Sequence, residues 1–112
     1  MSMSKRLLIV IATADREKAL AGLMYAKNAW AAAWFEDVKV VFFGPSEKLI
    51  VRDDEVANEL QKASVIGELF ACKAISEKEG ISEDLEKLGL TVVGVGPIVS
   101  KFINEGYVPM VW

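Results

Sequence analysis

The sequence predicts an α/β fold, a three-layer α/β/α domain with a mostly parallel five-stranded sheet. Apolar runs rich in β-branched residues alternate with helical stretches about five times along the chain. The first run, 7–12, is continuously apolar, as is typical of a strand that helices cover on both faces. With 112 residues the chain is long enough for one hydrophobic core, so residues 1–112 are expected to form a single domain.

The first half of the chain is expected to contain two strands, one long helix and two shorter helical segments. These are a strand at 7–12, a helix at 15–35, a strand at 38–43, a helical turn from Ser46 and a helix at 54–62. Gly44 and Pro45 end the second strand, because neither residue favours a continued ladder. Asp53 is a typical helix N-cap, since its carboxylate can accept from the free N–H groups of the first turn.

The second half repeats the same alternation. We expect a strand at 65–71, a helix at 72–79, a helix at 83–88 capped by Ser82, a strand at 91–95, a helix at 98–105 and a strand at 107–112. Gly80 ends the first of these helices, and Pro97 opens the last one at a first helical position. Pro109 cannot donate to a ladder, so the final strand is expected at a sheet edge or at a bulge. The whole pattern corresponds to flavodoxin-like layering of helices on a sheet.

The expected first helix has apolar residues on two sides. Between 19 and 35 only Lys27 is charged. Small residues lie on one side, where they allow close approach to the sheet, and bulky residues, including Trp30 and Trp34, lie on another. Since 53% of the chain is apolar, we predict a homo-oligomer in which Trp30 and Trp34 contact a neighbouring subunit. The alternative is a helix that is fully covered within the monomer.

Composition excludes several classes of function. The net charge is −3 and no Lys/Arg cluster exceeds two residues, which argues against nucleic-acid binding and polybasic membrane attachment. The chain has no histidine and one cysteine, so His-ligated zinc, multi-thiolate metal sites and catalysis by Ser-His or Cys-His pairs are excluded. Gly94-Val95-Gly96 is only a fragment of a phosphate loop, so a nucleotide cofactor is not expected. Taken together, these features predict a protein with no cofactor and no metal. Without a signal peptide or a membrane-spanning stretch, a cytoplasmic location is expected.

Cys72 is the candidate catalytic residue. It ends the expected third strand and precedes a helix, where free N–H groups favour the thiolate, and Lys73 adds a positive charge nearby. Ligands of open parallel sheets bind beyond the carboxyl ends of the strands. Thr13, Gly44 and Gly96 follow three other strands and are therefore candidate binding residues. The alternative interpretation is that Cys72 is a small buried hydrophobic residue.

Three stretches resemble the DsrE/DsrF-like family, which includes the YchN-like proteins. They are FFGPSEKL at 42–49, ACKA at 71–74 with Gly-Ile at 80–81, and INEGY at 103–107. The resemblance implies a parallel five-stranded α/β/α fold and trimeric or hexameric assembly. In the sulfur-relay members it implies a cysteine that carries sulfane sulfur as a persulfide, and Cys72 matches that position. The chain departs from those members in its mixed charge at 77–79, where they often carry basic residues.

We therefore expect a sulfur carrier in which Cys72 receives sulfur from a donor protein and passes it to an acceptor protein. Three alternatives stay open. The first is an oligomeric binding module that holds a small ligand at the same edge, with Cys72 only lining the site. The second is a partner-binding subunit that uses Trp30 and Trp34, and the third is a thiol peroxidase that depends on an external thiol.

Overall fold

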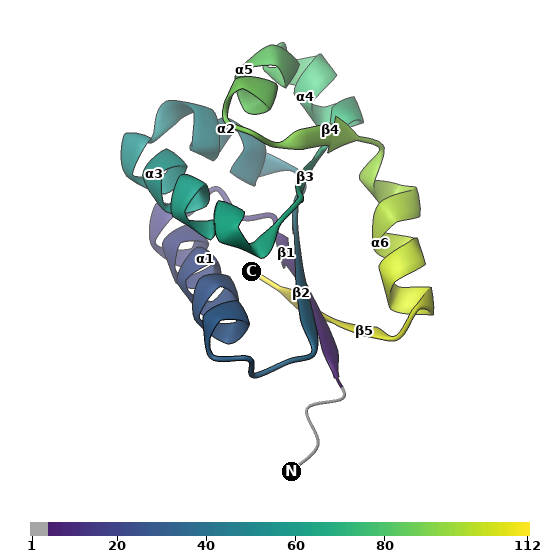
Figure 1. Ribbon diagram of the computed structural model, residues 1–112. Helices are drawn as coiled ribbons and strands as arrows, with labels where there is room; N and C mark the ends of the chain where they lie inside the picture. Colours follow the sequence, from purple (N-terminus) through teal and green to yellow (C-terminus); the bar gives the residue numbers. More distant parts are fainter. Residues whose placement is uncertain (1–4) are drawn as a thin grey trace.

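A computed structural model describes residues 5–112 as a sheet of five parallel strands with helices on both faces (Figure 1). The strands are β1 (Arg6–Ile11), β2 (Asp37–Phe42), β3 (Leu69–Cys72), β4 (Thr91–Val93) and β5 (Tyr107–Val111), in the order β4-β3-β2-β1-β5. The helices are α1 (Arg16–Ala31), α2 (Pro45–Arg52), α3 (Asp54–Lys62), α4 (Lys73–Glu79), α5 (Ser82–Lys87) and α6 (Val95–Asn104), with a 3-10 turn, η1 (Ala63–Ile66). The predicted fold class is confirmed, and residues 1–4 of the expected domain lie outside the described residues.

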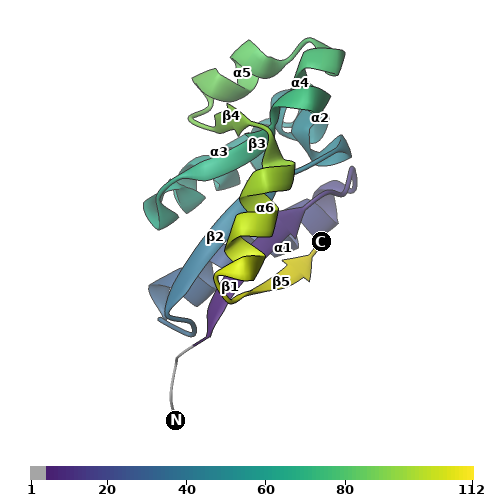
Figure 2. The ribbon, with the colours of Figure 1, turned by 90° about the vertical axis from the view of Figure 1, so that its right-hand side faces the viewer.

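The two faces of the sheet are covered unequally. Helices α1, α2, α3 and α5 contribute buried residues to the main hydrophobic core, which forms on one face of the sheet. Within residues 5–112 only α6 packs on the opposite face, where a smaller core forms around it (Figure 2). This asymmetry follows from the connections, because right-handed crossovers from β1 to β4 keep their helices on one side and the return from β4 to β5 uses the other side.

Helix α1 packs on the sheet through its smallest side chains, as the sequence predicted. Its buried residues are Ala19, Gly22, Leu23, Ala26 and Ala29. A Cβ on Gly22 would lie 3.0 Å from Cγ of Trp112, so this contact requires glycine. The helix ends at Ala31 instead of near residue 35, because Ala33 adopts φ 54° in the turn that follows.

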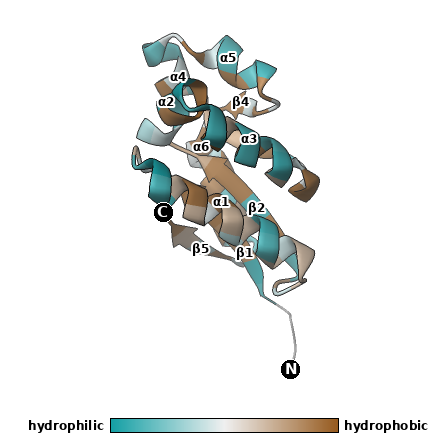
Figure 3. Ribbon diagram, turned by 90° about the vertical axis from the view of Figure 1, so that its left-hand side faces the viewer, coloured by the Kyte–Doolittle hydropathy of each residue, from teal (hydrophilic) through white to brown (hydrophobic). Residues whose placement is uncertain are grey.

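The bulky side of α1 remains open in the single chain. Trp30 is 43% exposed and Trp34 is 51% exposed, and Met24 beside them is also exposed. Figure 3 shows hydrophobic turns in α1 beside a largely hydrophilic α3. A monomer therefore leaves this apolar surface in contact with water.

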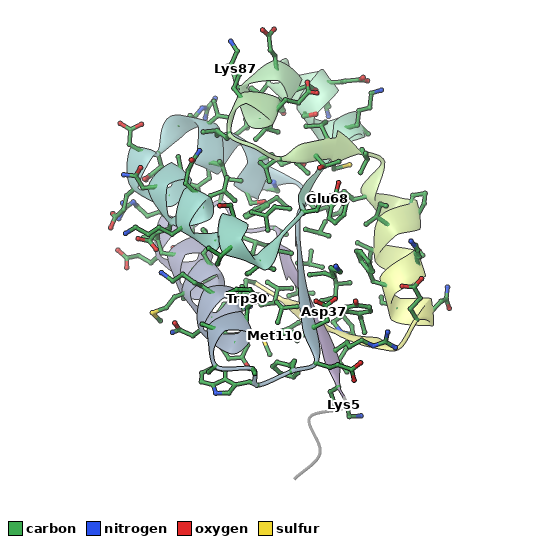
Figure 4. The ribbon with its side chains drawn as sticks, viewed as in Figure 1. Lys5, Trp30, Asp37, Glu68, Lys87 and Met110 are labelled. Atoms are coloured by element: carbon green, nitrogen blue, oxygen red, sulfur yellow. The ribbon has the colours of Figure 1, made fainter. Side chains whose placement is uncertain are left out.

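The third strand is shorter than the sequence predicted. Residues 65 and 66 belong to η1, which continues α3, and Gly67 then turns the chain with φ 113°. Glu68 consequently precedes β3 instead of lying inside it. Its Oε2 accepts a hydrogen bond of 2.8 Å from the Thr91 hydroxyl of β4, so it fastens the edge of the sheet (Figure 4).

Two helix starts also differ from expectation. Helix α6 begins at Val95 with Gly94 as its N-cap, so the fourth strand ends at Val93 and Pro97 is the third helical residue. Proline is tolerated there because the N–H groups of the first turn have no acceptor within the helix. Ser82 is the first residue of α5 and not its cap, and its hydroxyl pairs with that of Ser76 at 2.6 Å.

The placement of the final strand confirms the prediction from Pro109. Strand β5 forms one edge of the sheet, and Pro109 pairs with Leu8 of β1. A residue without an N–H group is tolerated at an edge, where one side of the ladder is unpaired.

The tight packing of α1 generates a stability prediction. Ala26 is fully buried against the sheet, so Ala26→Leu is expected to lower the free energy of unfolding by about 1–3 kcal/mol through overpacking. The matched control Ala31→Leu adds the same atoms at an exposed position of the same helix and should change stability by less than about 0.5 kcal/mol. Urea denaturation of both variants measures the difference, and equal values would contradict the packing described here.

Candidate functional site

Cys72 occupies the boundary between a strand and a helix. It is the last residue of β3 and the N-cap of α4, with extended backbone angles of φ −77° and ψ 118°. Its side chain makes no capping hydrogen bond. The residue is only 5% exposed and belongs to the smaller core, together with Phe70 of the same strand and Val95 of α6. The sequence prediction placed Cys72 correctly at the strand end, and the structure adds that the residue is buried.

The neighbouring strand makes this position topologically distinct. Cys72 pairs with Val93, the last residue of β4. The chain leaves β3 through α4, which contacts α2, and it leaves β4 through α6 on the opposite face. A crevice between two adjacent strand ends whose connections leave to opposite faces is the usual ligand site of open parallel sheets. Cys72 lies at that crevice.

Two hollows share lining residues with the smaller core that contains Cys72. The first, the α2–α4 pocket, has a volume of about 500 Å³ and is lined by Lys48, Leu49 and Arg52 of α2 and by Ile75 and Lys78 of α4. The second, the α6 groove, has a volume of about 590 Å³ and is lined by Val10, Val111 and the α6 residues Val95, Val99 and Ile103. Ile75 and Val95 also belong to the cluster that surrounds Cys72. Both hollows therefore border the core in which Cys72 is buried.

The other predicted site residues do not gather around Cys72. Gly44 lines the α2–α4 pocket, and Gly96 lines the α6 groove in the first turn of α6. The backbone N–H of Thr13 donates to the carbonyl of Trp112 at 3.3 Å, so it is already engaged.

Lys73 is also placed apart from the thiol. Its side chain is 59% exposed, and its Nζ lies 3.8 Å from a carboxylate oxygen of Glu77, one helical turn further along α4. An exposed pair at this distance and spacing contributes little to stability. The ammonium group of Lys73 therefore lies on the surface of α4, near the carboxylate of Glu77.

Glu47 is a site residue that the sequence analysis did not single out. It is fully buried in the first turn of α2, and its Oε2 accepts a hydrogen bond of 3.1 Å from the Gly44 N–H. Within the described residues its Oε1 has no hydrogen-bond partner. Burial raises the pKa of Glu47 to about 7, although the backbone N–H groups of Gly44 and Cys72 act in the opposite direction. The side chain thus closes the turn between the end of β2 and the start of α2.

The three-residue spacing of Gly44 and Glu47 is the sequence feature from which this hydrogen bond could have been predicted. A glutamate three residues after an N-cap reaches back to the cap N–H in a capping box. What the sequence did not reveal is the burial, which arises because the adjacent Ser46 hydroxyl donates to the Ile11 carbonyl at 2.5 Å and draws α2 onto the end of β1.

A solved structure shares this fold over its whole length. The chain superimposes on a conserved protein of unknown function, BT1422 from Bacteroides thetaiotaomicron, with a TM-score of 0.86 and 25% sequence identity, covering 100% of both chains. No family model and no curated protein matches the sequence. The comparison therefore establishes a fold shared with an uncharacterised small α/β protein.

Two further properties concern residues 5–112. Across this part of the chain, no helix combines the length and the apolar character needed to cross a membrane. Nor do these residues bring together three or more Cys, Asp or Glu side chains in a group that could hold a metal ion.

The buried carboxyl of Glu47 predicts an unusual dependence of stability on pH. Its pKa rises from 4.5 to about 7 on folding, so the unfolded chain releases the proton first as the pH increases. The free energy of unfolding contributed by this group should fall by about 3 kcal/mol between pH 4.5 and 7 and then level off. Urea denaturation across this range measures the slope.

The variant Glu47→Gln is neutral at every pH and should lose that part of the slope. Glu86→Gln removes a carboxylate from an exposed position of α5 and should keep the wild-type slope. If Glu47→Gln and the wild type showed parallel profiles, folding would leave the pKa of Glu47 unchanged.

Proposed function

We propose that this protein is a sulfur carrier of the DsrE/DsrF-like type, in which Cys72 holds sulfane sulfur as a persulfide. The observation that supports it most directly is the position of Cys72 at the carboxyl end of β3 and the N-cap of α4. The first-turn N–H groups of α4 donate no hydrogen bond to the Cys72 side chain, so they are free to stabilise a negative charge on sulfur.

The chemistry requires one thiol and no cofactor. The Cys72 thiolate attacks the outer sulfur of a donor persulfide, R–S–SH. A new S–S bond forms on Cys72 while the donor S–S bond breaks, and the donor leaves as the thiol R–SH once the proton has moved to it. An acceptor thiolate then attacks the outer sulfur on Cys72 and regenerates the cysteine thiolate. Both transfers are exchanges of sulfur between thiols, so no external oxidant or reductant is consumed.

Access to the buried sulfur requires a small local movement. Cys72 is only 5% exposed, and Ile75 and Val95 of the surrounding core line the α2–α4 pocket and the α6 groove, respectively. Rotamer changes of such side chains are fast compared with sulfur transfer between proteins. Burial also protects a persulfide from water and from stray thiols between the two transfers.

Sulfur loading provides the test. After incubation with a persulfide donor, the intact protein is expected to gain the mass of one sulfur atom, and reduction with a thiol should remove it. Cys72→Ser should gain nothing, because it lacks the accepting thiolate. Intact-protein mass spectrometry measures both.

A second readout distinguishes a reactive thiol from an inert core residue. The folded wild type should react with an alkylating reagent at neutral pH faster than a free cysteine of pKa ~8.5. Failure to load sulfur from several donors, combined with alkylation only after unfolding, would show that Cys72 is a packing residue.

We further propose that the chain is a homo-oligomer that buries the exposed bulky side of α1. The Trp34 ring lies 5.8 Å from the ring of Tyr25, so it is held in place before association. Aromatic side chains with fixed positions and large exposed area are typical interface anchors. The family resemblance favours a trimer or a hexamer.

Polar substitution tests this surface. The double variant Trp30→Gln with Trp34→Gln is expected to shift the mass in solution to a smaller species, measured by analytical ultracentrifugation. Val65→Gln changes an exposed apolar residue of η1 outside this surface and should leave the mass unchanged. An unaltered mass for the double variant would place the subunit contact elsewhere.

A further inference from the structure

The α2–α4 pocket combines an apolar floor with several cationic side chains. Lys48 and Arg52 lie one helical turn apart on α2, and Lys78 approaches from α4. The apolar part of the lining comes from Pro45 and Leu49 of α2 and from Ile75 of α4. The two classes of side chain thus meet in one cavity of about 500 Å³, a size typical of small-molecule sites.

The positive charge of this pocket is only partly compensated. Glu79 is its one acidic lining residue, and its Oε2 lies 3.3 Å from Nζ of Lys48. Arg52 and Lys78 form no salt bridge within residues 5–112. Three cations against one carboxylate leave two positive charges at the pocket, although the whole chain carries a net charge of −3. A concave positive site in an acidic protein attracts small anions.

Helix stability alone does not explain this convergence. Arg52 and Lys78 each lie in the last turn of a helix, where a cation interacts favourably with the helix dipole. The helix dipole would stabilise these two cations whichever outward direction their side chains took. Instead, two helices from different parts of the sequence present them to the same cavity.

The position of the pocket also agrees with a binding role. Ala14 follows β1 and Gly44 follows β2, and both line it. The pocket therefore lies beyond the carboxyl ends of the two adjacent strands, at the edge where open parallel sheets bind their ligands. Gly44 has φ 88°, so the backbone turns sharply there without a side chain to fill the space.

We propose that the α2–α4 pocket binds a small organic oxyanion, whose phosphate or carboxylate group pairs with Arg52 and Lys78 and whose apolar part contacts Leu49 and Ile75. A guanidinium and an ammonium suit oxygen anions of either kind. This site does not include Cys72, so the proposal is independent of sulfur transfer.

Four probes separate the two contributions to binding. Phenyl phosphate and benzoate carry both an anion and an apolar ring, inorganic phosphate carries only the anion, and benzyl alcohol only the ring. Chemical shifts of the backbone amides of Gly44, Leu49, Ile75 and Lys78 report occupancy of the pocket. At least one of the two aromatic anions is expected to bind in the millimolar range or tighter, and more tightly than the two partial probes. Binding of phenyl phosphate alone assigns a phosphate-bearing ligand, and binding of benzoate alone assigns a carboxylate.

Variants test the assigned side chains. Arg52→Met and Lys78→Met should each weaken binding of the aromatic anion about tenfold, as expected for loss of one charge-assisted hydrogen bond. Lys101→Met removes the same charge from an exposed position of α6, and Cys72→Ser removes the thiol. Both should bind as the wild type does.

Several outcomes would overturn the proposal. These are the absence of any shift at the four amides, equal binding of the aromatic anions and benzyl alcohol, or an equal loss of affinity in Lys101→Met. If Arg52→Met and Lys78→Met do not fold, the salt dependence of anion binding by the wild type tests the proposal instead. Affinity for the aromatic anion must fall as sodium chloride is added, and an affinity independent of salt would exclude pairing with these cations.

Discussion

The structure depends on one constraint, which is that a parallel sheet must be covered on both faces. In the described part of this chain several helices cover one face, whereas a single helix covers the other. Helices α1, α2, α3 and α5 and the turn η1 contribute to the main core on the α1 side. On the opposite side α6 is the one helix within residues 5–112, and its core is correspondingly small. The α6 groove is the direct result, because the ends of β1 and β5 extend beyond the surface that one helix can cover.

The same connection creates the site at Cys72. Because the chain must cross from β4 back to β5 over the second face, the ends of β3 and β4 lead in different directions and leave a crevice between them. Cys72 is buried at the end of β3, beside this crevice. Glu47 is buried in the first turn of α2, where its carboxylate accepts from the Gly44 N–H and closes the turn that follows β2.

Strong local patterns predicted the main features correctly. The continuous apolar run of β1, the small residues of α1 and Pro109 in β5 each have one favourable structural solution, and all three were placed correctly. The prediction was wrong where a short apolar run can form either a strand or a helical turn. Val65 and Ile66 are β-branched, yet Gly67 turns the chain and leaves them in η1.

The candidate site was only partly predictable for a different reason. The position of Cys72 at a strand end follows from local sequence, but the core in which it is buried is completed by Phe102 of α6 and Tyr107 of β5, which are distant in sequence. The pocket cations Arg52 and Lys78 are far apart in sequence, and each has an ordinary explanation within its own helix. Only the tertiary arrangement of α2 and α4 brings them to one cavity.

The pairing of β1 with β5 has a consequence for the order of folding. Arg6 is opposite Tyr107, so the interior strand β1 acquires its second neighbour only after all the residues between these two positions have been synthesised. Until then, the side of β1 that carries Leu8 and Val10 has neither α6 nor β5 to shield it from water. A nascent chain therefore exposes this apolar surface until α6 and β5 have been synthesised, and such a surface can bind chaperones or aggregate.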